Sequence, residues 1–143
     1  MLARTGQNHV SISIFEGNEE FGLVLICDGA NEPFFFKMTG TGALSGRTYF
    51  AGEVTVSGTT APTVGAIHDK HFVVAGASTA KNTLFYSSTL DPTSFSGSGA
   101  GSILLDDQVV GLKSFRTDLI IFCVNSIYRL ININDSSNIA VVP

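Results

Sequence analysis

Residues 110–130 decide the fold of this chain, and they read VGLKSFRTDLIIFCVNSIYRL. Two apolar runs, Leu119–Cys123 and Ile127–Leu130, are separated by the short break Asn125-Ser126. A further run that opens at Val110-Gly111 reaches the first of them through the polar link Arg116-Thr117-Asp118. Links this short join antiparallel neighbours, because parallel strands need a crossover of about a dozen residues or more. The stretch therefore predicts an antiparallel meander.

The rest of the chain repeats this pattern. Short runs rich in β-branched and aromatic residues alternate with Gly, Asn, Asp, Ser and Pro, and we find no window of helical periodicity. The predicted strands are His9–Phe15, Gly22–Cys27, Pro33–Met38, Arg47–Val56, Val64–His68, His71–Ala75, Thr83–Ser87, Ser102–Leu105, Val109–Phe115, Leu119–Val124, Ser126–Ile131 and Ile139–Val142. We expect an all-β protein of antiparallel, blade-like sheets in one domain, residues 1–143.

An internal repeat adds detail to this fold class. The run from Val64-Gly65 turns at Asp69-Lys70, and a second run from Val110-Gly111 turns at Thr117-Asp118, which gives an offset of 110 − 64 = 46 residues. Periods of roughly 40–50 residues are typical of β-propeller blades. Leu23–Cys27 with Pro33–Phe36 forms a weaker third instance. Three blades do not close a propeller, which has about four to eight. Two packings are therefore open: a partial propeller, and a sandwich or prism-like arrangement with a bent sheet.

The connections divide into turns and loops. Asp28-Gly29-Ala30-Asn31 supplies the left-handed positions of a tight loop. Thr39–Gly46 and Asp91–Gly101 are rich in Gly, Ser and Thr, so we expect surface or interface loops there.

Charge and composition exclude several function classes. The net charge is −4 and charged residues make up 14% of the chain, with its eight Lys and Arg scattered. This argues against direct binding to a phosphate backbone, and we expect no sequence-specific nucleic-acid partner. The longest apolar run, Leu23–Cys27, is too short to span a membrane. The N-terminus, Met1–Gly6, lacks the hydrophobic region of a signal peptide, and Cys27 and Cys123 are expected to be buried thiols made in a reducing cytoplasm.

No catalytic residue, metal site or cofactor is predicted. His68-x-x-His71 flanks a turn, and the simplest interpretation is a pair of solvated turn histidines; nothing places His9 near them. Asp106-Asp107 is expected to stabilise a turn or strand end, since adjacent strand residues point to opposite faces. We find no nucleophile with a base beside it and predict that the protein is not an enzyme.

Phe34-Phe35-Phe36 is the candidate assembly interface. Three aromatic residues in sequence on a strand cannot share one face. Either both faces are covered, by a neighbouring sheet or a second copy, or Phe35 is exposed. On this basis a Phe35→Ser replacement would weaken assembly more than folding. The rival is a carbohydrate platform built on Tyr49, Tyr86 and Tyr128, although the chain has no Trp.

Residues 64–130 resemble the blades of tail-hub and nozzle proteins of short-tailed bacteriophages, the group that includes packaged-DNA stabilisation proteins. The residues that carry the resemblance, in order, are Leu84-Phe85-Tyr86-Ser87-Ser88, Leu90-Asp91-Pro92-Thr93-Ser94-Phe95, Ser102-Ile103, Val110-Gly111-Leu112, Asp118–Phe122 and Asn125–Arg129. Leu25–Gly29 is similar to a strand and turn upstream in that family. Family members are several times longer, so this chain would be a fragment of a longer tail protein or a small relative.

The resemblance implies an architectural role. It predicts a virion structural protein of the tail or neck, made in the host cytoplasm, whose partners are copies of itself and other tail or portal proteins. Any DNA would then meet a channel wall. The alternative is a β-sheet module that binds a glycan or a protein.

Overall fold

The computed structural model describes residues 10–15, 23–39, 48–59 and 61–143. All regular structure in these ranges is β-strand. The strands are β1 Ser11–Phe15, β2 Leu23–Cys27, β3 Phe34–Thr39, β4 Thr48–Glu53, β5 Val64–His68, β6 His71–Ala75, β7 Thr83–Tyr86, β8 Gly101–Leu104, β9 Val109–Phe115, β10 Asp118–Cys123, β11 Ile127–Ile131 and β12 Ala140–Val142. The all-β prediction is confirmed.

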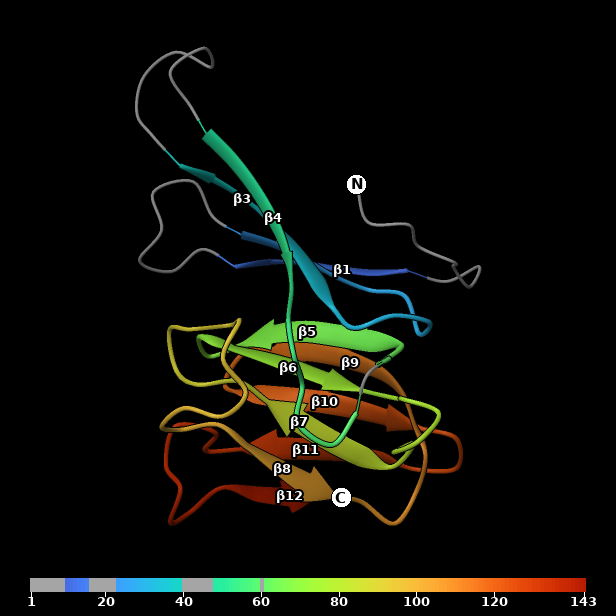
Figure 1. Cartoon of the computed structure of the whole chain (residues 1–143). Coiled ribbons are helices and arrows are strands. Elements are labelled where there is room, and N and C mark those ends of the chain that lie inside the picture. The colour runs from blue at the N-terminus through green and yellow to red at the C-terminus, as the bar shows by residue number, and fades with distance from the viewer. Residues whose placement is uncertain (1–9, 16–22, 40–47, 60) are drawn as a thin grey trace.

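The strands form three antiparallel sheets of four strands each, and every sheet is a simple meander (Figure 1). The first sheet has the order β1-β2-β3-β4, the second β5-β6-β7-β8, and the third β9-β10-β11-β12. Short polar links such as Asp69-Lys70 and Arg116-Thr117 favour this topology, because they can join only antiparallel neighbours. The sheets are blade-like, as the repeat predicts.

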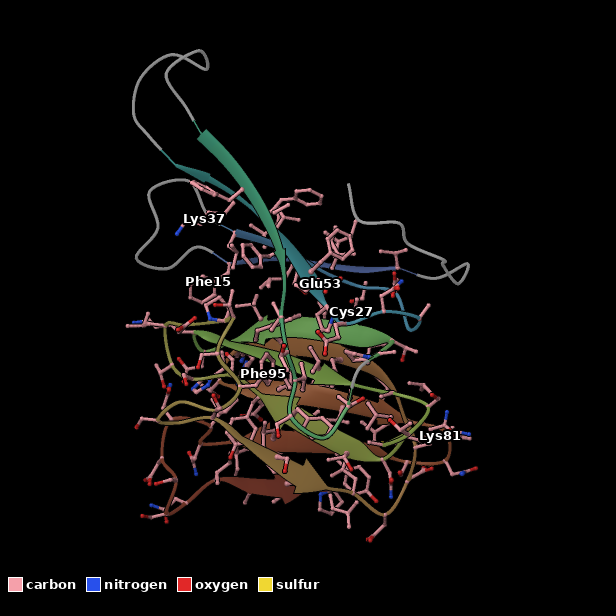
Figure 2. All side chains as sticks on the ribbon, in the orientation of Figure 1. Phe15, Cys27, Lys37, Glu53, Lys81 and Phe95 are labelled. Atoms are coloured by element: carbon pink, nitrogen blue, oxygen red, sulfur yellow. The ribbon has the colours of Figure 1, made fainter. Side chains whose placement is uncertain are left out.

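The second sheet lies between the other two. One of its faces contributes Phe72, Val74 and Phe85 to a cluster with the first sheet, where Phe15, Leu25 and Cys27 pack (Figures 1 and 2). Its other face contributes Val73, Ala75 and Leu84 to a cluster with Leu119, Ile121 and Leu130 of the third sheet. Strand β6 is consequently buried at all five positions.

The three sheets come closest along their first strands, since β5 contacts both β1 and β9. The Ser11 hydroxyl accepts a hydrogen bond from the Gly65 amide at 3.1 Å and lies 3.0 Å from the Gly65 carbonyl oxygen, to which it donates. A Cβ on Gly65 would lie 2.7 Å from the Phe72 ring, so glycine is required where β1 crosses β5. On the other side, His68 Nδ1 is 2.8 Å from Ser114 Oγ of β9.

The repeat offset is 47 residues, and the predicted value of 46 is wrong by one. His68 pairs with His71 across the turn Asp69-Lys70, and Phe115 pairs with Asp118 across the turn Arg116-Thr117, so 116 − 69 = 47. The predicted turn at Thr117-Asp118 begins one residue too late. The two glycines are not equivalent, because Gly65 pairs with Val74, which corresponds to Ile121, whereas Gly111 pairs with Phe122. One residue matters, because it exchanges the two faces of a strand.

Most local predictions agree with the structure. Gly29 has φ 71°, and the Asp28 carboxylate accepts hydrogen bonds from the Ala30 and Asn31 amides, as the turn chemistry predicts. Asp91–Ala100 forms a loop that leads into β8, and the Cys27 and Cys123 side chains are buried, as predicted. The Thr39–Gly46 loop beyond Thr39, His9 and the Met1–Gly6 terminus lie outside the described residues.

The second sheet provides a matched test of this packing. Leu84 is fully buried against the third sheet, whereas Leu104, on the edge strand of the same sheet, is 75% exposed. We expect Leu84→Ala to lower the free energy of unfolding by about 2–5 kcal/mol, and Leu104→Ala by less than about 0.5 kcal/mol. Urea denaturation followed by circular dichroism measures both. Similar losses in the two variants would contradict the assignment of the core.

Candidate assembly interface

The outer face of the first sheet, turned away from the second sheet, is apolar and largely uncovered. Cross-strand pairing places the side chains in two rows, Ile12–Ile26–Phe34–Glu53 and Ile14–Val24–Phe36–Ala51. Ile12, Ile14 and Phe36 are 64%, 62% and 50% exposed. A contiguous apolar patch of this kind marks an interaction site, so this outer face is the candidate functional site.

The phenylalanine run divides between the two faces of β3. Phe34 and Phe36 lie on the outer face, where their rings meet edge to face with centroids 5.5 Å apart. Phe35 points the other way and packs against the cluster between the first and second sheets. A Cβ on Gly52, its partner on β4, would lie 2.9 Å from the Phe35 ring, so the ring occupies the space of that missing side chain.

This arrangement changes the expected role of Phe35. The sequence suggested that losing Phe35 would affect assembly, but its ring belongs to the inner cluster, which a neighbouring sheet covers. Phe34 and Phe36 are the members of the run on the candidate interface. Ile12 and Ile14 were not among the predicted interface residues, although the alternation Ser11-Ile12-Ser13-Ile14 is the signal of a strand with one apolar face.

The outer face of the third sheet is the second uncovered apolar surface. Phe115, Phe122 and Ile127 are exposed on it, and Ile120 and Ile131 are half-buried beside them. Lys113 and Arg129 lie on the same face, and the Arg129 guanidinium forms a salt bridge of 3.0 Å with Asp118. This face is therefore apolar with a small excess of positive charge.

His68 and His71 are buried, and the interpretation as solvated turn histidines is wrong. They are 2% and 0% exposed, because the face of β5 and β6 that carries them is covered by the third sheet. His71 Nδ1 lies 2.5 Å from the Ser87 carbonyl oxygen, and its Nε2 lies 2.8 Å from Asn134 Oδ1. Asn134 is oriented by hydrogen bonds from its amide to Asp69. These contacts use both ring nitrogens of His71 for structure.

The carboxylates also have structural partners. Asp107 accepts hydrogen bonds from the Asn125 amide at 2.7 Å and the Ser126 hydroxyl at 2.8 Å, and these bonds hold its pKa below the ordinary value. Asp107 thus fixes the β10–β11 hairpin, which agrees with the expected turn role of Asp106-Asp107. Among the described residues, no group of three His, Cys, Asp or Glu side chains could hold a metal ion.

The free edges of β1, β5 and β9 line a groove of about 360 Å³. Ser11, Ser13 and Ser114 contribute hydroxyls to it and Lys113 contributes an ammonium group, and Ile12, Ile14, Ile67 and Leu112 supply its apolar part. Two of the three tyrosines of the carbohydrate hypothesis are only partly exposed. Tyr86 and Tyr128 are half-buried against the cluster between the second and third sheets, and the Tyr49 side chain lies outside what the structure describes.

No protein-family model, no curated protein and no solved structure matches this chain. In the part of the chain that the structure describes, no helix has the length and hydrophobicity needed to cross a membrane.

Phe35 and Phe36 are adjacent and chemically identical, so they separate folding from association. We expect Phe35→Ala to lower the free energy of unfolding by about 2–4 kcal/mol at every protein concentration, because it empties part of the inner cluster. Phe36→Ala should change the unfolding of the dilute chain by less than about 0.5 kcal/mol. Its effect should grow with protein concentration if the ring is buried on association. Urea midpoints at two concentrations measure this, and equal, concentration-independent losses would refute the assignment.

Burial of His68 produces a pH dependence. Burial lowers the pKa of His68 below its ordinary value, and the carboxylates of Asp69 and Asp118 oppose the shift only in part. An unfolded histidine is protonated near pH ~6.5, so below that pH the unfolded chain binds more protons than the folded one. The stability contributed by the neutral ring is therefore complete above about pH 6.5 and is lost as the pH falls toward the folded pKa.

We accordingly expect the urea midpoint to fall between about pH 7 and pH 5. His68→Gln, which stays neutral and retains a polar group for Ser114, should flatten this fall. The lowered pKa values of Asp107 and Asp135 affect stability only at lower pH, below about 4. An unchanged slope in His68→Gln would show that another group causes the dependence.

Proposed function

We propose that this protein is a non-catalytic structural component of a bacteriophage tail or neck, which assembles by stacking its outer sheet faces against partner sheets. The observation that carries the proposal is the uncovered apolar outer face of the first sheet, with Ile12, Ile14 and Phe36 half or more exposed. Exposed apolar area of this extent favours association, since its burial stabilises a complex by roughly 25 cal/mol per Å² before the costs of binding.

The composition supports a surface designed for burial. Only 14% of the residues are charged, and the polar surface comes largely from Gly, Ser and Thr, including 15 Gly. Uncharged polar groups cost less to desolvate than Lys or Glu. The bacteriophage assignment rests on the ordered resemblance between residues 64 and 130 and tail-hub and nozzle proteins. The partners would be copies of this chain and other tail or portal proteins.

The role is tested in purified particles of the phage that encodes the chain. We expect peptides of this protein in intact virions and in isolated tails, at a fixed ratio to the portal protein, by quantitative mass spectrometry. A second arm presents the purified chain to a glycan array. Absence from washed particles would refute the virion role, and a strong glycan signal from a monomeric chain would favour the alternative binding module.

A further inference from the structure

We propose that two copies of this chain associate head to tail, with the outer face of the first sheet of each copy packed on the outer face of the third sheet of the other. The result is a closed ring of six blade-like sheets. This inference rests on the proposed role as an assembling subunit and names the partner of its candidate interface.

The junctions inside the chain have a fixed polarity. Under the offset of 47, the side of the second sheet that meets the first sheet corresponds to the side of the third sheet that meets the second. For example, Phe72 corresponds to Leu119 and Val74 to Ile121, and all four are fully buried. Both internal junctions therefore join the same two kinds of face in the same order.

The two outer faces are the unused halves of such a junction. The outer face of the first sheet corresponds to the face of the second sheet that carries Phe72 and Val74. The outer face of the third sheet, which carries Ile120 and Phe122, corresponds to the face of the second sheet that carries Val73 and Ala75. A second copy placed head to tail repeats the internal junction at both sites. Pairing of two first sheets would instead leave Phe115, Phe122 and Ile127 uncovered.

The shape of the stack favours a ring over a filament. The sheets come closest at β1, β5 and β9, where Gly65 and Ala66 are small, and β7 carries the larger Leu84, Phe85 and Tyr86. Each sheet with its side chains is thus wedge-shaped, and the narrow end of the wedge lies at the first strand of the sheet. Repeated wedges curve around their narrow ends, and six of them fall within the roughly four to eight blades of known propellers, whereas nine do not.

The experiment uses the purified chain of residues 1–143 and light scattering after size exclusion. The expected mass is twice 15.1 kDa. Ile14→Asp alters the first-sheet face and Ile127→Asp the third-sheet face, at residues of equal size that are 62% and 58% exposed. Because each places a carboxylate in both junctions of the ring, each should raise the dimer dissociation constant at least about 100-fold. Leu104→Asp, on an edge strand outside both faces, is the control and should stay dimeric.

Mixing separates head-to-tail pairing from every symmetric alternative. Ile14→Asp and Ile127→Asp mixed in equal amounts can form one junction without a substitution, so a mixed dimer should appear at concentrations at which each variant alone is monomeric. If circular dichroism shows that either variant is unfolded, Ile12→Asp and Phe115→Asp replace them on the same faces.

The outcomes divide clearly. Loss of the dimer in both variants with rescue on mixing supports the ring. A monomeric wild-type chain, an open polymer, or a dimer sensitive to only one of the two substitutions would overturn it. None of these results bears on whether the protein occurs in virions, so the ring can fail while the proposed tail role stands, and the reverse also holds.

Discussion

Burial of β6 on both of its sides is the constraint on which the rest of the structure depends. A strand in a sheet has two faces, and all five residues of β6 are buried because the first sheet covers one face and the third sheet covers the other. A continuous apolar run is the sequence signature of such a strand. The second sheet is therefore the only one of the three with both faces covered, and the first and third sheets each retain an apolar face that the described residues leave exposed.

The twelve strands could be predicted from the sequence because their signal is local. Alternating apolar residues and short polar links are sufficient to place Val64–His68, His71–Ala75 and Val109–Phe115 at the bounds observed. The blade-like repeat could be recognised for the same reason. Its offset could not be fixed, because the same dipeptide Val-Gly occurs in both runs at positions that pair differently, Gly65 with Val74 and Gly111 with Phe122. In a strand buried on both sides, a shift of one residue in the pairing register leaves the hydrophobic pattern unchanged. The same shift decides which face of the strand meets which sheet.

The role of the phenylalanine run as an assembly interface stays a prediction, and the sequence did not give the direction of each ring. Phe34 and Phe36 lie on the outer face of β3, whereas the middle ring packs over Gly52, a residue on the next strand with no side chain of its own. The burial of His68 and His71 depends on Ser114 and Asn134, which are 46 and 63 residues away along the chain. No local pattern contains such contacts. From its polarity alone, a histidine is predicted to lie at the surface. Here a neighbouring blade supplies its hydrogen-bond partner and buries it.

The close approach of the first strands explains several residues that have no role in the apolar clusters. Near the narrow ends of the wedges, backbone meets backbone, and Ser11 bridges the amide and carbonyl groups of Gly65 on the free edge of β5. A buried edge without such partners would leave polar groups unsatisfied at a cost of about 1–3 kcal/mol each. The His68–Ser114 contact joins β5 to β9 between the next two sheets. Hydroxyl groups thus add polar contacts between the first strands, beside apolar side chains such as Phe15 of β1 and Ile67 of β5. A face that continues this series needs polar groups near the first strand and apolar side chains on the strands beyond it. The outer face of the third sheet has Lys113 beside Gly111 and Phe115 on β9, and Phe122 and Ile127 on the strands that follow.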